Sequence, residues 1–243
     1  MNEEHPPIRD IDWRYRVATT LAQDFISPEG VLHKKGTPVK VATFVKHGEQ
    51  RIRIGDPSAP ALFLSQSYKA HQQALQIHPF IHKPGGDKDP SITTYDYLEL
   101  IMASIIFAYT AIEAFANEEI PEDLTYEEQI DSGLLIPRQK EWIERHLSLD
   151  EKIGSVLPKA KGKPTPRGLS IWEGYVHLRR LRDRIIHMKS HDRARSKADN
   201  LYPDSIWSEL LYPEQRNYPL IAKSMLLHFR DKDDTHWLKY CPF

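Results

Sequence analysis

Residues 178–190 read LRRLRDRIIHMKS. The leucines and isoleucines of this stretch recur at the spacing of one helix face, which predicts the end of an amphipathic helix. At about 100° per residue, Arg182 falls inside the apolar arc, and His187 lies about 140° around the helix from it. A charge within an apolar arc is costly unless it is paired or functional. Arg182 and His187 are therefore the first candidate functional residues. Asp183, four residues before His187, can contact it across one helical turn.

Charge is distributed unevenly along the chain. Residues 179–197 contain eight lysines and arginines against two aspartates, whereas residues 113–131 contain eight acidic residues and no lysine or arginine. The basic stretch could meet the phosphate groups of a nucleic acid. Alternatively, the two stretches are solvated surfaces that pair with each other.

The composition is that of an ordinary globular protein. The 243 residues are 40% hydrophobic and 28% charged, with a formal net charge of −1, which identifies no class of partner. The one cysteine, Cys241, excludes a disulfide framework and a cysteine-based zinc site, and it favours a reducing, cytoplasmic location. The polar, acidic N-terminus is unlike a signal peptide, and we expect no membrane-spanning segment.

The first 60 residues differ in pattern from the rest. Alternating residues at 39–45, a turn at 47–50 and the segment 51–54 predict an antiparallel hairpin. Residues 13–25 fit both a strand and a helix, and the pattern does not decide between them. We expect a small β-containing region over residues 1–60, which ends at a turn-forming stretch.

Residues 61–243 predict helices with short connections. Turn signals and apolar spacing place these helices at 61–77, 93–119, 138–156, 170–190 and 214–230, with a short segment around Trp207. The expected fold class is therefore mainly α, a four- or five-helix bundle preceded by a small antiparallel β region.

The helix expected over residues 93–119 has the composition of a core helix. Residues 100–112 contain no charged side chain, so we expect this helix at the centre of the bundle. Glu113 follows directly, with Tyr109 one turn before it and Asn117 one turn after it. A carboxylate on such a helix needs a partner, and Arg182 is the candidate. The pair either supports a functional site or is a structural salt bridge that fixes helix register.

Together these residues resemble the HEPN superfamily (higher eukaryotes and prokaryotes nucleotide-binding). Its members are helical bundles, many with an Arg-x4–6-His motif near the end of a late helix. Arg182-Asp183-Arg184-Ile185-Ile186-His187 matches that motif, with Asp183 in the polar position after the arginine. Ala111-Ile112-Glu113-Ala114-Phe115 is similar to the acidic element that the family often has on an earlier helix. The resemblance covers residues 61–230.

The resemblance implies a HEPN-like bundle and a metal-independent endoribonuclease without a cofactor, which leaves 2′,3′-cyclic phosphate and 5′-hydroxyl ends on RNA. It also implies a homodimer, in which His187 of one subunit approaches Arg182 of the other. The implied catalytic residues are Arg182, His187 and Asp183, and the implied supporting residues are Glu113, Asn117 and Tyr109.

RNA contacts are expected from the basic residues around the motif. These are Arg179, Arg184, Lys189, Arg193, Arg195 and Lys197, flanked by Lys159, Lys161 and Lys163. Active members of the family often serve in toxin–antitoxin or antiviral defence systems, with an antitoxin or defence partner protein that restrains them. Some toxin members have a modifiable tyrosine two residues after the histidine, where this chain has Lys189.

Two other functions stay open at this point. One is a non-catalytic HEPN-like module that binds nucleotides or proteins. The other is a helical nucleic-acid-binding regulator, in which the basic helix contacts phosphates without cleaving them.

Overall fold

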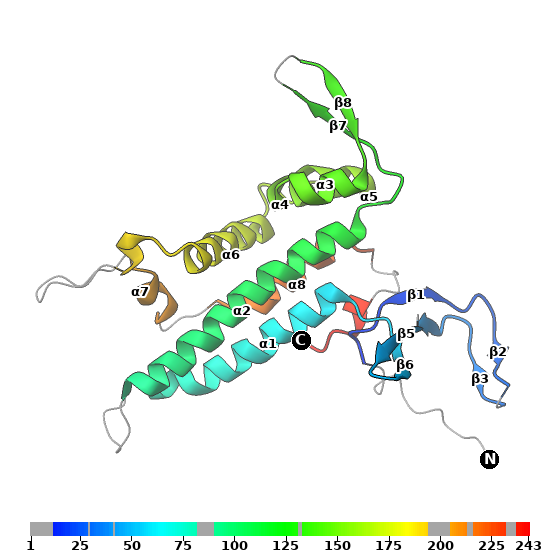
Figure 1. Cartoon of the computed structure of the whole chain (residues 1–243), viewed down its shortest axis with the longest axis horizontal. Coiled ribbons are helices and arrows are strands. Elements are labelled where there is room, and N and C mark those ends of the chain that lie inside the picture. The colour runs from blue at the N-terminus through cyan, green and yellow to red at the C-terminus, as the bar shows by residue number, and fades with distance from the viewer. Residues whose placement is uncertain are drawn as a thin grey trace, which may run out of the picture. The chain divides into compact units, whose positions relative to one another are not determined.

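The computed structural model of the chain describes residues 12–28, 30–40, 42–81, 90–130, 133–193, 205–212, 216–231 and 237–243. It confirms a mainly α fold with small antiparallel sheets (Figure 1). The chain divides into two compact units. The smaller unit comprises Met1–Leu62 and Asp231–Phe243, and the larger unit comprises Phe63–Arg230.

Short two-stranded antiparallel sheets form the smaller unit. The pairs are β1 (Val17–Thr20) with β4 (Pro38–Lys40), β2 (Phe25–Ile26) with β3 (Leu32–His33), and β5 (Ala42–His47) with β6 (Gln50–Gly55). The hairpin expected over residues 39–54 is confirmed as β5 and β6. The undecided stretch 13–25 contains strand β1 and no helix.

The end of the chain belongs to this smaller unit. Trp237, the first residue of the 3-10 helix η5 (Trp237–Tyr240), and Phe243 both lie against the ring of Trp13, at centroid distances of 5.7 and 6.1 Å. The sequence-based division placed these residues with the helical part. The structure differs because the rings of Trp13 and Phe243 pack against Trp237 and Trp13, respectively, and Trp237 is buried there.

Gly55, at the end of β6, allows a close approach of the preceding segment. A Cβ atom on Gly55 would lie 1.6 Å from Cε1 of Tyr15. The N–H of Arg16 donates to the carbonyl of Asp56 at 2.8 Å, next to this contact. Glycine is therefore required for residues 12–16 to pack on the end of the hairpin.

Four longer helices build the larger unit: α1 (Ala59–Ile77, which begins in the smaller unit), α2 (Pro90–Glu119), α6 (Ser170–Ile186) and α8 (Tyr218–His228). Shorter elements connect them. These are η2 (His78–Phe80), β7 (Tyr126–Gln129), β8 (Leu135–Arg138), α3 (Lys140–His146), α4 (Leu149–Glu151), the π-helical η3 (Lys152–Val156), α5 (Leu157–Lys161), η4 (Ser190–Arg193) and α7 (Ile206–Leu210).

Helix α2 is the centre of the larger unit, where it packs against α6 and α8 and also contacts α1 (Figure 1). The Ser67 hydroxyl on α1 donates to the carbonyl of Ser104 at 2.8 Å, and the rings of Phe63 and Phe107 stack at 6.2 Å. The Tyr97 hydroxyl donates to the carbonyl of Leu210 on α7 at 2.9 Å. The long uncharged run of α2 is therefore explained by packing on several sides.

The same run also meets the length and composition of a membrane-spanning helix. Residues 91–119 include an 18-residue window with a mean hydropathy of 1.7, and 44% of that window is buried inside the chain. From the sequence we expect no such segment. Length and composition are shared by membrane spans and by the core helices of helical bundles.

One buried stripe fixes the rotation of α6. Tyr175, Leu178, Leu181 and Ile185 are buried at intervals of three and four residues. The helical spacing of the sequence places all four within one apolar arc, and their burial confirms it. The helix ends at Ile186 rather than at residue 190, because the backbone of His187 leaves helical geometry at φ −113° and ψ 41°.

The single helix expected over residues 138–156 is wrong. Arg138 is the last residue of β8, where it pairs with Tyr126 of β7. Its guanidinium also donates to Glu128 at 2.8 Å. A second break follows α3, where the Ser148 hydroxyl accepts from the N–H of Glu151 and starts a new helix. Local hydrogen bonds by side chains therefore divide this stretch.

Two other helix ends differ from expectation. Helix α2 begins at Pro90 rather than at residue 93, since proline is well suited to the first turn of a helix. Helix α8 begins at Tyr218 rather than at residue 214. The side chain of Asn217 accepts a hydrogen bond from the N–H of Leu220 at 3.1 Å and so caps the start of the helix.

His71 is buried in the larger unit without a hydrogen bond at Nδ1 from any residue that the structure describes. Its ring meets that of Tyr218 edge-on at 6.0 Å. Burial lowers the pKa of His71. The unfolded chain, with an ordinary histidine pKa of about 6.5, then binds more protons than the folded chain just below that value.

We therefore predict that stability is lost as the pH falls through about 6.5, and that His71→Phe reduces this loss. The measurement is the free energy of unfolding in urea at pH 7 and pH 5. His47→Gln, at an exposed site of β5, is the control and should leave the pH dependence unchanged. Equal losses in wild type and His71→Phe would contradict the prediction.

Candidate functional site

A cavity of about 680 Å³ lies along α6 and the segment that follows it. Helix α6 and its C-terminal cap line the cavity with residues that recur at helical intervals of three and four. The segment after the helix adds two more lining residues. The lining residues are Val176, Arg179, Arg180, Asp183, Arg184 and His187, followed by Lys189 and Asp192. This polar stripe is separate from the buried stripe of the same helix.

His187 is exposed at the C-terminal cap of α6. Its backbone N–H donates to the carbonyl of Asp183 at 2.9 Å. An imidazole at this place can exchange a proton with a ligand in the cavity. The structure thus brings His187, Asp183 and several cations of the expected set together.

Arg179 and Arg180 are each held by a carboxylate. A guanidinium nitrogen of Arg179 donates to Asp150 of α4, and one of Arg180 donates to Glu209 of α7. A guanidinium has five N–H donors, so each arginine keeps donors that these ion pairs do not use. Both can therefore still bind an anionic group.

Arg184 is engaged through all three of its nitrogens. Its Nε and one terminal nitrogen donate to Asp192 at 3.1 and 2.5 Å, and the other terminal nitrogen donates to Glu209 at 2.7 Å. The Asp192 side chain is only 2% exposed. Arg184 was expected to contact RNA, but this geometry assigns it to linking α6, η4 and α7.

Arg182 lies on the side of α6 that faces α2 and does not line the cavity. Its guanidinium lies over the ring of Tyr109 at 4.9 Å, which is a cation–π contact. It also donates to the neighbouring Asp183 at 3.0 Å. The expected pairing of Arg182 with Glu113 is therefore replaced by pairing with Asp183. The Asp183 carboxylate is engaged by Arg182 and not by the His187 ring.

Glu113 and Asn117 face a buried lysine that sequence reasoning missed. Lys152, 2% exposed, donates to Asn117 at 2.9 Å and to the carbonyl of Glu144 at 2.6 Å. Burial lowers the pKa of Lys152, while the carboxylates of Glu113 and Glu144 raise it. The π-helical turn that holds Lys152 has no sequence signature here, and such turns are frequent at functional sites.

Tyr175 and Asp150 were also missed. The Tyr175 hydroxyl donates to Asp150 at 2.5 Å, and its ring stacks on that of Tyr109 at 6.3 Å. Burial raises the pKa of both tyrosines, and Glu113 adds to the increase at Tyr109. The spacing of Tyr175 with Leu178 and Arg182 could have placed it on the face toward α2.

The two stretches of opposite charge do not pair with each other within the described residues. Glu119 binds Lys161 at 2.5 Å and also Arg230, and Glu128 binds Arg138. The arginines of α6 are instead held by acids from α4, η4 and α7. The alternative in which the acidic and basic stretches pair with each other is therefore wrong for the ion pairs that the structure describes.

The structure does not describe some of the expected RNA-binding residues. Arg195 and Lys197 fall outside the described residues, as does the side chain of Arg193. Lys189 is exposed and lines the cavity. Of the flanking lysines, Lys159 is exposed at α5, whereas Lys161 is engaged by Glu119.

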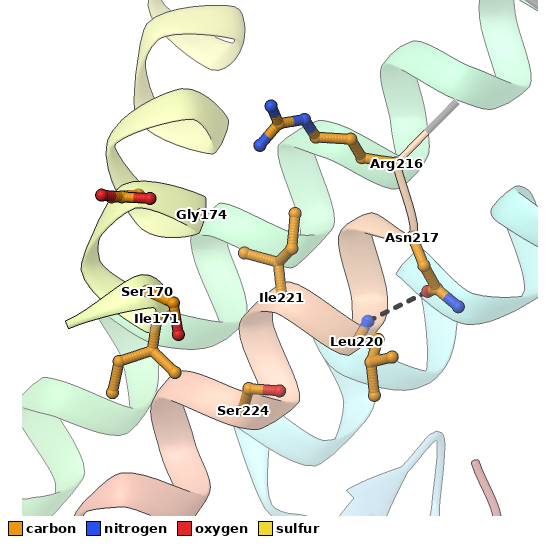
Figure 2. Close-up of a pocket in the computed structure, with 9 residues that line it drawn as sticks. Ser170, Ile171, Gly174, Arg216, Asn217, Leu220, Ile221 and Ser224 are labelled. Atoms are coloured by element: carbon orange, nitrogen blue, oxygen red, sulfur yellow. Dashed lines mark hydrogen bonds between the residues drawn. The ribbon is translucent and has the colours of Figure 1, made fainter. Parts of the chain in front are cut away.

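A second cavity, of about 490 Å³, lies between α6 and α8. Figure 2 shows Ile171, Leu220 and Ile221 along it, with Arg216 at one edge and Asn217 capping α8. A Cβ atom on Gly174 would lie 3.2 Å from Cγ2 of Ile221, so the two helices are closely packed there. Since no imidazole of the described residues lines this cavity, the first cavity is the better candidate for proton-transfer chemistry.

No protein-family model matches the sequence, and neither the curated proteins nor the solved structures gave a match to it.

We predict that Arg184→Gln destabilises the protein far more than Arg180→Gln, one turn earlier on α6. Breaking a buried ion pair costs on the order of 3 kcal/mol. Arg184 and Asp192 are 18% and 2% exposed. Arg180 is 54% exposed, and exposed pairs contribute about 1 kcal/mol or less. Urea denaturation of both variants measures the difference, and equal costs would refute the assignment of Arg184 as a structural link.

Proposed function

We propose that this protein is a metal-independent endoribonuclease of the HEPN type. The observation that supports the proposal most is the cavity in which exposed His187 lies beside Arg179, Arg180 and Lys189. The Arg-x4-His pattern at the end of α6, in a mainly helical unit, agrees with it.

RNA provides its own nucleophile, the 2′-hydroxyl next to the phosphate that is cleaved. In the proposed reaction, the His187 imidazole accepts the 2′-hydroxyl proton, and the 2′ oxygen bonds to phosphorus. The bond from phosphorus to the 5′ oxygen breaks, and the proton passes to that oxygen. The products are a 2′,3′-cyclic phosphate and a 5′-hydroxyl.

Arginine stabilises the charge on the phosphoryl oxygens in this scheme. Arg180 is 54% exposed on the cavity side, so it can donate its remaining N–H groups to a phosphate. Asp150 and Glu209 hold Arg179 and Arg180 in place before a ligand binds. This pre-organisation lowers the entropy cost of binding.

The role of Arg182 requires a second copy of the chain. Arg182 faces α2 and Tyr109, whereas His187 lines the cavity. A two-fold interface over this region would place His187 of one subunit beside Arg182 of the other. The proposal therefore includes a homodimer with RNA as its substrate.

A non-catalytic HEPN-like binding module is the second candidate. The Asp183 carboxylate accepts from Arg182, and His187 has its backbone, not its ring, bonded to Asp183. In this alternative the cavity binds a nucleotide or a protein segment without breaking a bond.

We predict that His187→Ala and Arg182→Ala each lower the rate of RNA cleavage by at least about 100-fold. Loss of His187 removes general acid–base catalysis, which contributes about 10²–10⁴-fold. Loss of Arg182 removes a charge that stabilises the phosphoryl oxygens, which contributes about 10²–10³-fold. Cleavage of a labelled RNA in the presence of a chelator measures the rate. Treatment of the products with a phosphatase, before and after acid opening of cyclic phosphate ends, identifies the termini.

His146→Ala is the matched control. His146 is an exposed histidine of α3 that stacks on Trp142 at 4.9 Å, away from the cavity residues. Its variant should cleave RNA like wild type. If His187→Ala and Arg182→Ala also cleave at the wild-type rate, the nuclease assignment is wrong.

A further inference from the structure

The cavity on α6 has little unbalanced charge with which to hold a long polyanion. Arg179, Arg180 and Arg184 each form an ion pair with Asp150, Glu209 or Asp192. Binding of an RNA backbone depends on cations that replace its counterions. A polyanion is therefore held better by exposed cations that have no acidic partner.

The β5–β6 hairpin of the smaller unit has such cations on one face. Phe44 is paired across the strands with Arg53, and Lys46 with Arg51. Because alternate residues of a strand point to the same side, these four side chains share a face. The Arg51 guanidinium lies over the Phe44 ring at 5.1 Å, which agrees with that placement.

The three cations of this face are exposed. Within the described residues, none of Lys46, Arg51 and Arg53 forms an ion pair or a hydrogen bond through its side chain. The acidic residue of the hairpin, Glu49, lies in the turn. The hairpin thus presents three uncompensated positive charges along a ribbon of two strands.

Phe44 lies among these cations and is 58% exposed. Its ring therefore offers an open aromatic face next to positive charges. Sequence-tolerant binding of single-stranded nucleic acids combines cations along the backbone with aromatic rings on which bases stack. Lys46, Arg51, Arg53 and Phe44 supply both parts.

We infer that this face of the β5–β6 hairpin, defined by Phe44, Lys46, Arg51 and Arg53, is a binding site for single-stranded RNA. The choice of RNA as the ligand rests on the proposed function. Unpaired bases are needed to reach the Phe44 ring, which favours single-stranded over double-stranded RNA.

An anionic membrane is the main competing ligand, and the hairpin disfavours it. Val45, Ile52 and Ile54 are between 37% and 39% exposed, but their register places them on the opposite face from the cations. A lipid surface binds through apolar and basic side chains that face the same way. Phe44 is the large apolar side chain on the cation face, and the three aliphatic side chains cannot enter the same surface with the cations.

The test measures how a labelled 2′-O-methyl oligouridylate of twelve nucleotides binds to the full chain. Fluorescence anisotropy of the label reports the binding. The 2′-O-methyl groups remove the nucleophile, so binding is measured without cleavage. The triple variant Lys46→Gln/Arg51→Gln/Arg53→Gln should reduce the slope of log affinity against log salt concentration by about 2. Each phosphate contact that is lost lowers this slope by about 0.7. Phe44→Leu should weaken binding about fivefold or more.

Two further variants separate charge from folding. Arg51→Lys/Arg53→Lys keeps the charges and should keep the salt slope near that of wild type. Lys34→Gln removes a lysine that Asp24 already pairs at 2.9 Å, and should leave RNA binding nearly unchanged. Thermal unfolding of each variant checks that the smaller unit stays folded.

Wild-type affinity and salt slope in the triple-glutamine variant would overturn the inference. So would loss of binding to phosphatidylcholine–phosphatidylserine vesicles in that variant with RNA binding unchanged. The nuclease proposal fails separately. Loss of RNA binding in the hairpin variant, with no cleavage of ordinary RNA by wild type, would refute catalysis and support the hairpin site.

Discussion

Burial of the apolar stripe of α6 is the constraint on which the rest of the candidate site depends. Leu178, Leu181 and Ile185 must be buried, and this fixes the rotation of the helix. Once the rotation is fixed, Arg182 faces the Tyr109 ring of α2, and His187 faces the cavity. The separation of the two residues is therefore a consequence of packing, which a local change of side-chain rotamer does not reverse.

Carboxylates from other elements complete the arrangement. Asp150 holds Arg179, Glu209 holds Arg180, and Asp192 with Glu209 holds Arg184. These pairs connect α4, α7 and η4 to α6, so they stabilise the walls of the cavity as well as orienting its cations. The same pairs compensate much of the positive charge. By contrast, the cations of the β5–β6 hairpin in the smaller unit are uncompensated, and we propose that they bind RNA there.

Periodicity predicted the elements that have many apolar contacts. It located α1, α2 and α6, and alternation located the β5–β6 hairpin. It failed over residues 138–156, where the Arg138–Glu128 contact and the Ser148 cap divide the chain. The arc containing Arg182 and Tyr175 could be read from spacing. The carboxylates that bind α6, Asp150 and Glu209, and the buried Lys152 could not, because they are brought there by tertiary contacts between elements far apart in sequence.

We propose that Arg182 and His187 form one site only between two copies of the chain. Mixing the inactive Arg182→Ala and His187→Ala proteins tests it most directly. A mixed dimer retains one site with both residues intact. After random exchange of subunits, the mixture should recover about a quarter of the wild-type rate of RNA cleavage. A mixture no more active than either variant alone, under conditions where wild type cleaves and mixed dimers form, would contradict the account.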